Sequence, residues 1–82
     1  MAGNIENARD VQLTIIDLAH QTDAALQRLH TSKHQVDSTI TRIALEAATE
    51  NVQTAWAQLT LAAGNLHAVG IGAPVTIKAV SA

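Results

Sequence analysis

Apolar residues recur at steps of three and four along the first third of the chain. An α-helix turns by about 100° per residue, so positions at this spacing share one helical face. The pattern predicts a helix over about residues 5–30, with Asn4 as its N-cap and Glu6 in the first turn, where the helix dipole favours an anion. The apolar stripe consists of Ala8, Val11, Ile15, Leu18, Ala19, Thr22, Ala25, Leu26 and Leu29.

Three further apolar residues lie beside this stripe. Ile5, Leu13 and Ile16 fall on a neighbouring flank of the same helix. A single partner helix would not cover both the stripe and the flank, so we expect Leu13 and Ile16 to take part in an interface with another chain.

The polar stretch His30–Gln35 (HTSKHQ) separates the first apolar stripe from the next. Ser32 and Gln35 have the S-x-x-Q spacing of a capping box, in which each side chain bonds a free backbone N–H at the start of a helix. The stretch therefore predicts a helix–helix connection. Because it contains neither Gly nor Pro, one unbroken helix is the alternative.

A second helix is predicted over about residues 34–69. Its early apolar positions form one stripe, and its later ones form a second stripe with heptad spacing, rotated by about 120°. Two stripes on one helix indicate two packing surfaces or a bend. Gly70, followed by Pro74, is the expected stop signal. The early stripe is Val36, Ile40, Ile43 and Ala47, and the later one is Leu45, Ala48, Val52, Ala55, Leu59, Ala62, Leu66 and Val69.

The segment Asn51–Ile77 contains no Asp, Glu, Lys or Arg. A helix that faces water normally carries charge on its outer face, so we expect this segment to be enclosed by protein or to contact something apolar. Trp56, at the edge of the later stripe, fits an interface anchor and a residue packed within one hairpin equally well. The interface predicted on this segment consists of Val52, Ala55, Trp56, Leu59, Ala62, Leu66 and Val69.

The C-terminal residues 70–82 change character, because two glycines and a proline interrupt the helical pattern. We expect a flexible or extended tail. The alternative is a short strand at Val75–Ile77 that adds to a neighbouring subunit. Residues 1–82 form one domain on this interpretation.

Composition favours association. The 82 residues include 16 Ala and no Phe or Tyr, so an apolar fraction of 48% overstates the capacity to form a core. Chains of this size commonly need disulfides, a metal or oligomerisation, and the absence of Cys excludes disulfides. Oligomerisation is the expected remedy.

The charge distribution argues against several partners. With a net charge of −2 and a single Trp, the chain lacks the basic surface and stacking platforms of nucleic-acid-binding proteins. Membrane contact is not expected for residues 51–77, since Gln58, Asn65 and His67 are costly in hydrocarbon. The N-terminus has no secretory signal, so we expect cytoplasmic synthesis, with the chain as part of a larger assembly.

Candidate chemistry is sparse. His30 and His34 at i, i+4, with Asp37 one turn on, are metal ligands by residue type, but Lys33 adds a repelling charge and the predicted connection disturbs the spacing. Solvated polar residues are the expected role, and no metal or cofactor site is predicted. No nucleophile is placed beside a base, so no catalytic residues are predicted and the chain is expected not to be an enzyme.

The predicted architecture resembles two families of short helical hairpins, the small type VII-secreted proteins and the type III secretion needle subunits. The Trp-x-Gly turn of the first is replaced by Trp56-Ala57-Gln58, and the chain has no Tyr for its export motif. The Pro-containing turn of the second is absent, since Pro74 is the only proline. The resemblance concerns architecture alone and identifies no family.

These patterns together predict an all-α helical hairpin that packs as an oligomeric helical bundle. The function expected is that of a non-enzymatic structural subunit, which self-assembles through apolar helix faces into a homo-oligomer or filament of a virion, tail or secretion apparatus. The alternative is a small adaptor or secretion partner that forms a hetero-complex with another helical protein.

Overall fold

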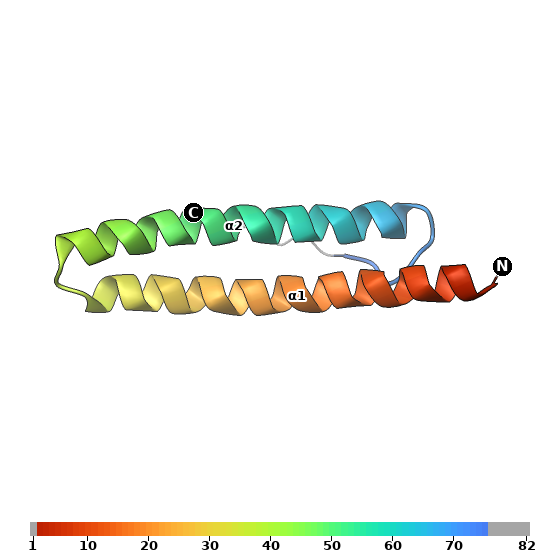
Figure 1. The fold of residues 1–82 in the computed structure, drawn as a ribbon, viewed down its shortest axis with the longest axis horizontal. Coiled ribbons are helices and arrows are strands. Elements are labelled where there is room, and N and C mark those ends of the chain that lie inside the picture. The colour runs from red at the N-terminus through yellow and green to blue at the C-terminus, as the bar shows by residue number, and fades with distance from the viewer. Residues whose placement is uncertain (1, 76–82) are drawn as a thin grey trace.

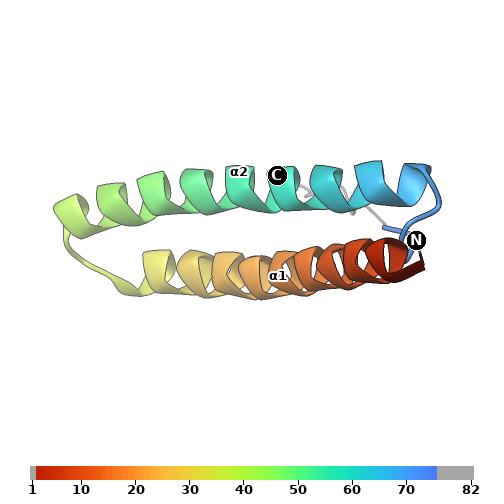
Figure 2. The same cartoon turned by 45° about the vertical axis from the view of Figure 1, so that its right-hand side comes forward.

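The computed structural model describes residues 2–75 and consists of two long antiparallel helices. Helix α1 spans Ala2–Gln35 and helix α2 spans Thr39–Ala68, and they lie side by side in both views of the ribbon (Figures 1 and 2). The molecule measures 56 × 21 × 14 Å. The predicted all-α helical hairpin is confirmed.

The hairpin turn lies further along the chain than predicted. Helix α1 continues through His30–Gln35, where a connection was expected, because this stretch contains no residue that breaks a helix. The chain turns at residues 36–38, and the side chain of Ser38 caps α2 by accepting a hydrogen bond from the backbone N–H of Thr41 at 3.3 Å. Ser38 rather than Ser32 is therefore the N-cap, and the prediction of a capping box at Ser32 is wrong.

The start of α1 also differs from the prediction. The helix begins at Ala2, so Asn4 lies within it and is not its N-cap. Glu6 follows the first turn, which carries no acidic residue. Ala and Asn are both tolerated in a first turn, and neither Gly3 nor Asn4 is a strong enough breaker to delay a helix of 34 residues.

Helix α2 ends where the sequence predicted. The N–H of Gly70 bonds the carbonyl of His67 at 2.9 Å, and the N–H of Ile71 bonds the carbonyl of Leu66 at 3.0 Å. These two bonds form a Schellman motif, which requires a left-handed residue after the helix; Gly70 supplies it with φ of +84°. The stop at Gly70 is confirmed.

The seam between the helices is narrow and partly polar. Among the described residues, Leu26 and Ala63 are the buried apolar side chains, and Gln12, Thr49 and Thr60 are buried with them. The two threonines satisfy their hydroxyls within α2, bonding the carbonyls four residues earlier at 2.7 and 2.8 Å. Small and internally bonded side chains let the helices approach, but they bury little apolar area.

The molecule consequently exposes more surface than a compact protein of its size. Its accessible surface is 5992 Å², whereas a compact monomer of 8.6 kDa exposes about 4,700 Å². The excess is about 1,300 Å². A two-helix hairpin exposes this extra surface because each helix has only one neighbour to pack against.

The described part of the tail returns to α1. Residues 71–75 leave the end of α2 and cross to the N-terminal half of α1 (Figure 1). The short strand considered at Val75–Ile77 lies largely outside the described residues, which end at Val75.

Candidate interaction surfaces

The open end of the hairpin is joined through one buried side chain, that of Gln12. Its Nε2 donates hydrogen bonds to the carbonyl oxygens of Ala63 at 3.1 Å and Ala73 at 2.8 Å. Its Oε1 accepts a bond from the N–H of Ala73 at 3.0 Å. The Gln12 amide thus pairs with the Ala73 backbone as a neighbouring strand would, and it connects α1, α2 and the tail.

The lack of a side chain at Gly72 leaves room for the Gln12 side chain in this junction. Its φ of +80° lies in the left-handed region, where a side chain is unfavourable. A Cβ at this position would overlap the side chain of Gln12, which is fully buried and held by three bonds. His67 adds a contact, with its Nδ1 3.3 Å from the carbonyl oxygen of Gly72. Sequence reasoning missed the Gln12 junction; the only local signal was a polar residue amid the apolar stripe of α1.

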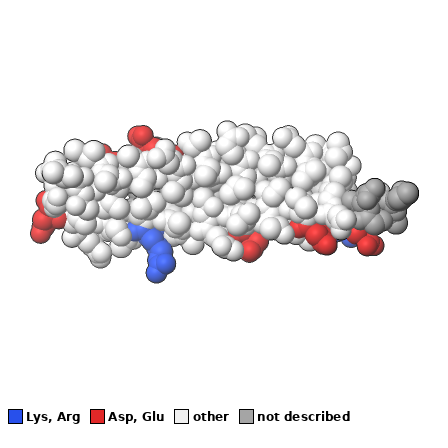
Figure 3. Space-filling view, in the orientation of Figure 1, with Lys and Arg blue, Asp and Glu red and all other residues white. Residues whose placement is uncertain are grey.

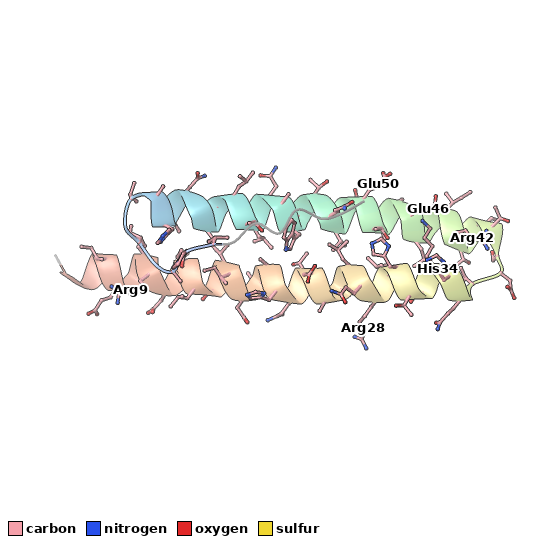
Figure 4. The ribbon with its side chains drawn as sticks, turned by 180° about the vertical axis from the view of Figure 1, so that it is seen from behind. Arg9, Arg28, His34, Arg42, Glu46 and Glu50 are labelled. Atoms are coloured by element: carbon pink, nitrogen blue, oxygen red, sulfur yellow. The ribbon has the colours of Figure 1, made fainter. Side chains whose placement is uncertain are left out.

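The hairpin-loop end is held by exposed polar contacts instead. Lys33 forms a 3.4 Å ion pair with Glu46, and both side chains are substantially exposed. The Arg42 guanidinium donates to the carbonyl of Val36 at 3.2 Å. Figure 4, viewed from behind, shows Arg42 and Glu46 of α2 together with His34 of α1 toward this end. Water and salt screen such contacts, so they contribute little to stability.

The later stripe of α2, predicted as an interface, is divided by the structure. Val52, Leu59 and Leu66 are half-buried beside the seam, whereas Ala55 and Val69 are exposed. Thr49 and Ala63 are buried, although the stripe assigned these turns to Ala48 and Ala62. Helix α2 is therefore turned about its own axis, by less than the angle between adjacent residues, relative to the orientation that the apolar pattern predicts.

Trp56 explains part of this rotation. Its side chain is half-buried on the helix face that packs toward α1, one residue from the exposed Ala55. Turning the only aromatic residue inward covers more apolar area than turning an alanine inward. Ala63 also takes an inward position, where a small side chain leaves room for the amide of Gln12.

The flank residues of α1 separate as well. Leu13 is exposed and points away from α2, and Ile5 is 59% exposed. Ile16 is half-buried and lies on the same side of α1 as Gln12. The structure therefore does not bring Leu13 together with the stripe of α2.

The early stripe of α2 is largely exposed to solvent. Ile40 is 82% exposed and Ile43 is 61% exposed, close to the hairpin loop. The two stripes do lie on different faces, and α2 remains one continuous helix between them.

A broad face that spans both helices carries no charged residue within the described part of the chain. Figure 3 shows this face, with the acidic and basic side chains confined to its margins. Helical spacing places apolar residues of both helices on it at seven-residue intervals, and all of them are exposed except Ala62, which is half-buried. We call it the uncharged face, and define it by Val11, Leu18 and Ala25 of α1 and Ala55, Ala62 and Val69 of α2.

The polar residues considered for metal binding do not form a cluster. His30 and His34 share one exposed side of α1, because the helix continues through them, but Asp37 lies beyond its end. Within residues 2–75, no group of three His, Asp or Glu side chains is placed to hold a metal ion. Among the described helices, none is long and apolar enough to cross a bilayer.

Comparisons with known proteins do not add to this picture. A scan against protein-family models, a search of curated proteins and a search of solved structures each found no match. The arrangement of side chains on the hairpin is therefore the basis for a functional proposal.

Proposed function

We propose that this chain is a non-enzymatic structural subunit that self-assembles through apolar helix faces into a homo-oligomer or filament. The observation that carries the proposal is the distribution of apolar side chains. Leu26 and Ala63 are the buried ones among the described residues, whereas eight large apolar side chains are 44–82% exposed. Packing against other copies would remove such side chains from water, which is the main favourable term in protein association.

The exposed area supports the same proposal quantitatively. A stable interface buries about 800 Å² on each partner. The excess of about 1,300 Å² over a compact monomer exceeds one such interface, and two would be needed to cover it. A subunit with neighbours on two sides is the unit of a larger bundle or of a filament.

Light scattering coupled to size exclusion tests the proposal directly. Purified chain at micromolar concentration should have the mass of two or more copies and should remain helical by circular dichroism. A well-folded monomer of 8.6 kDa at that concentration would contradict it. A chain that is soluble but poorly folded alone, and that co-purifies with a different helical protein, would instead support the adaptor function.

A further inference from the structure

We infer that the uncharged face is the surface on which a second copy of this chain packs, face to face, to form a four-helix bundle. The inference rests on the proposed self-assembly and specifies which of the exposed surfaces is used. It differs from the interface predicted on the sequence, because Trp56 and part of the stripe of α2 are occupied within the hairpin, and because Val11 and Leu18 of α1 are included.

The apolar residues of the uncharged face have heptad spacing on both helices. Val11, Leu18 and Ala25 recur every seven residues on α1, and Ala55, Ala62 and Val69 recur every seven residues on α2. A seven-residue repeat keeps side chains on one line along a helix that packs against another helix over several turns. Both lines face the same side of the hairpin, so one partner can contact both.

The uncharged face is also large enough to bind a second copy. Helix α2 has 30 residues, which corresponds to a length of about 45 Å. With the 21 Å width of the hairpin, this length gives a footprint of about 900 Å². A stable dimer needs about 800 Å² per partner, so the face is large enough for one.

The edges of the uncharged face carry polar side chains. A row of amide side chains at seven-residue spacing, Asn51, Gln58 and Asn65, borders the face on α2, and all three are exposed. On α1 the corresponding border carries Asn7 and Gln21 together with the charged Arg28, and the Gln21 amide donates a hydrogen bond to the Asp17 carboxylate at 2.9 Å. An amide both donates and accepts hydrogen bonds, so the α2 rows of two copies can pair without repulsion between like charges. An apolar centre with a polar border is typical of protein interfaces.

The opposite side of the hairpin fits this role less well. It carries the tail residues held by Gln12 and the charged residues Arg42 and Glu46 near the loop (Figure 4). A second copy on that side would have to cover charges that are solvated in the single hairpin, and removing a charge from water is costly.

Two neighbouring alanines provide a matched test. Ala55 lies on the uncharged face and Ala57 on the opposite flank of the same helix, and both are exposed in the hairpin. An aspartate at either position is therefore compatible with the fold of one hairpin. We expect Ala55→Asp to weaken self-association by about 100-fold or more in Kd, because the carboxylate would be buried without a partner. Ala57→Asp should change Kd by less than about threefold.

Sedimentation equilibrium of the wild type and both variants, with circular dichroism as a check on helicity, gives distinct outcomes. If the wild type associates and Ala55→Asp associates equally well, or if both variants lose association equally, the uncharged face is not the interface, although the proposed function stands. A wild type that remains a folded monomer overturns both the inference and the proposed function.

Cysteine cross-linking offers a second measurement that does not depend on destabilising the assembly. The chain has no native cysteine, so single cysteines report on one position each. A face-to-face pair should give disulfide-linked dimers of Ala55→Cys, either with itself or mixed with Leu18→Cys, since either orientation of the partner brings one of these pairs together. Ala57→Cys should give none; dimers formed only through Ala57→Cys would contradict the inference.

Discussion

The seam inside the hairpin and the uncharged face outside it differ in how completely their apolar side chains are removed from water. Among the described residues, the seam buries Gln12, Thr49 and Thr60 beside two apolar side chains and leaves others, such as Trp56 and Leu59, half-buried, whereas the uncharged face exposes Val11 and Leu18. In a self-sufficient domain most large apolar side chains are buried. The incomplete burial of apolar side chains supports the proposal that the hairpin is part of a larger assembly of copies.

The polar groups of the seam all have hydrogen-bond partners within the hairpin. Polar groups in the seam are bonded internally, and within the described residues no buried side-chain nitrogen or oxygen lacks a partner. Such a seam fixes the register of the helices, since Gln12 can reach Ala63 and Ala73 in only one alignment. Apolar surfaces such as the uncharged face are less specific but contribute more free energy per area.

The largest effect is expected from Leu26, the one large apolar side chain buried in the seam. Leu26→Ala should lower the free energy of unfolding by about 2–5 kcal/mol, because it removes buried methyl groups and leaves a cavity. Urea denaturation followed by circular dichroism measures this loss. Leu61→Ala, at a side chain that is 53% exposed, is the control and should cost far less. Equal losses in the two variants would show that the seam does not hold the helices together.

Gln12 tests whether the polar part of the seam is needed. Gln12→Ala should destabilise the fold by about 1–3 kcal/mol, because the N–H and carbonyl of Ala73 lose their partners. Hydrogen exchange at the Ala73 amide should accelerate more than exchange in the middle of α2. Gln21→Ala, at an exposed position of the same helix, should leave that amide unchanged. Unaltered exchange at Ala73 in Gln12→Ala would mean that the tail is held by other contacts.

Two glycines sharpen the comparison, because the same substitution should have opposite signs. Gly72→Ala should destabilise by about 1–2 kcal/mol, since the left-handed conformation disfavours a Cβ and the Gln12 side chain occupies the space. Gly64→Ala should stabilise by about 0.5–1 kcal/mol, because Gly64 lies within α2 with nothing near its added Cβ. Thermal unfolding of the two variants measures both shifts. A gain in stability from Gly72→Ala would contradict the described junction.

The smallest effect is expected at the ion pair beside the loop. Glu46→Ala removes the 3.4 Å contact with Lys33, but both side chains are exposed enough to be screened by water. The loss should be at most about 1 kcal/mol and should shrink further at high salt. Urea midpoints at low and high ionic strength check this. A large loss that persists in salt would place the main attachment of the helices at the loop end rather than along the seam.

Local signals in the sequence predicted some features well. Two long helices follow from apolar spacing, and the end of α2 follows from Gly70, because a Schellman motif depends on a few neighbouring residues. The loop was misplaced since Ser32 and Ser38 are both acceptable caps, and local pattern cannot rank them. Ser38 is used because α1 meets no breaker before Gln35.

Features that depend on long-range contacts were not predictable. Nothing near Gln12 in the sequence indicates that its amide meets Ala73, 61 residues away. The rotation of α2 that turns Trp56 inward and leaves Ala55 outside depends on how both helices fit together. Trp56 and Ala55 are adjacent in the sequence, so the apolar pattern alone does not decide which of them faces α1. The predicted interface therefore included residues that the hairpin itself uses.

The central claim, that stability resides in contacts between copies, is tested most directly by the dependence of thermal unfolding on protein concentration. Folding coupled to association makes the unfolding midpoint rise with concentration, because mass action favours the assembled state. We predict that the unfolding midpoint of the wild type rises as the protein concentration is increased over a 100-fold range about one micromolar. The midpoint of Ala55→Asp should be lower and should rise less. A wild-type midpoint that is independent of concentration, at a mass of one chain, would contradict the account.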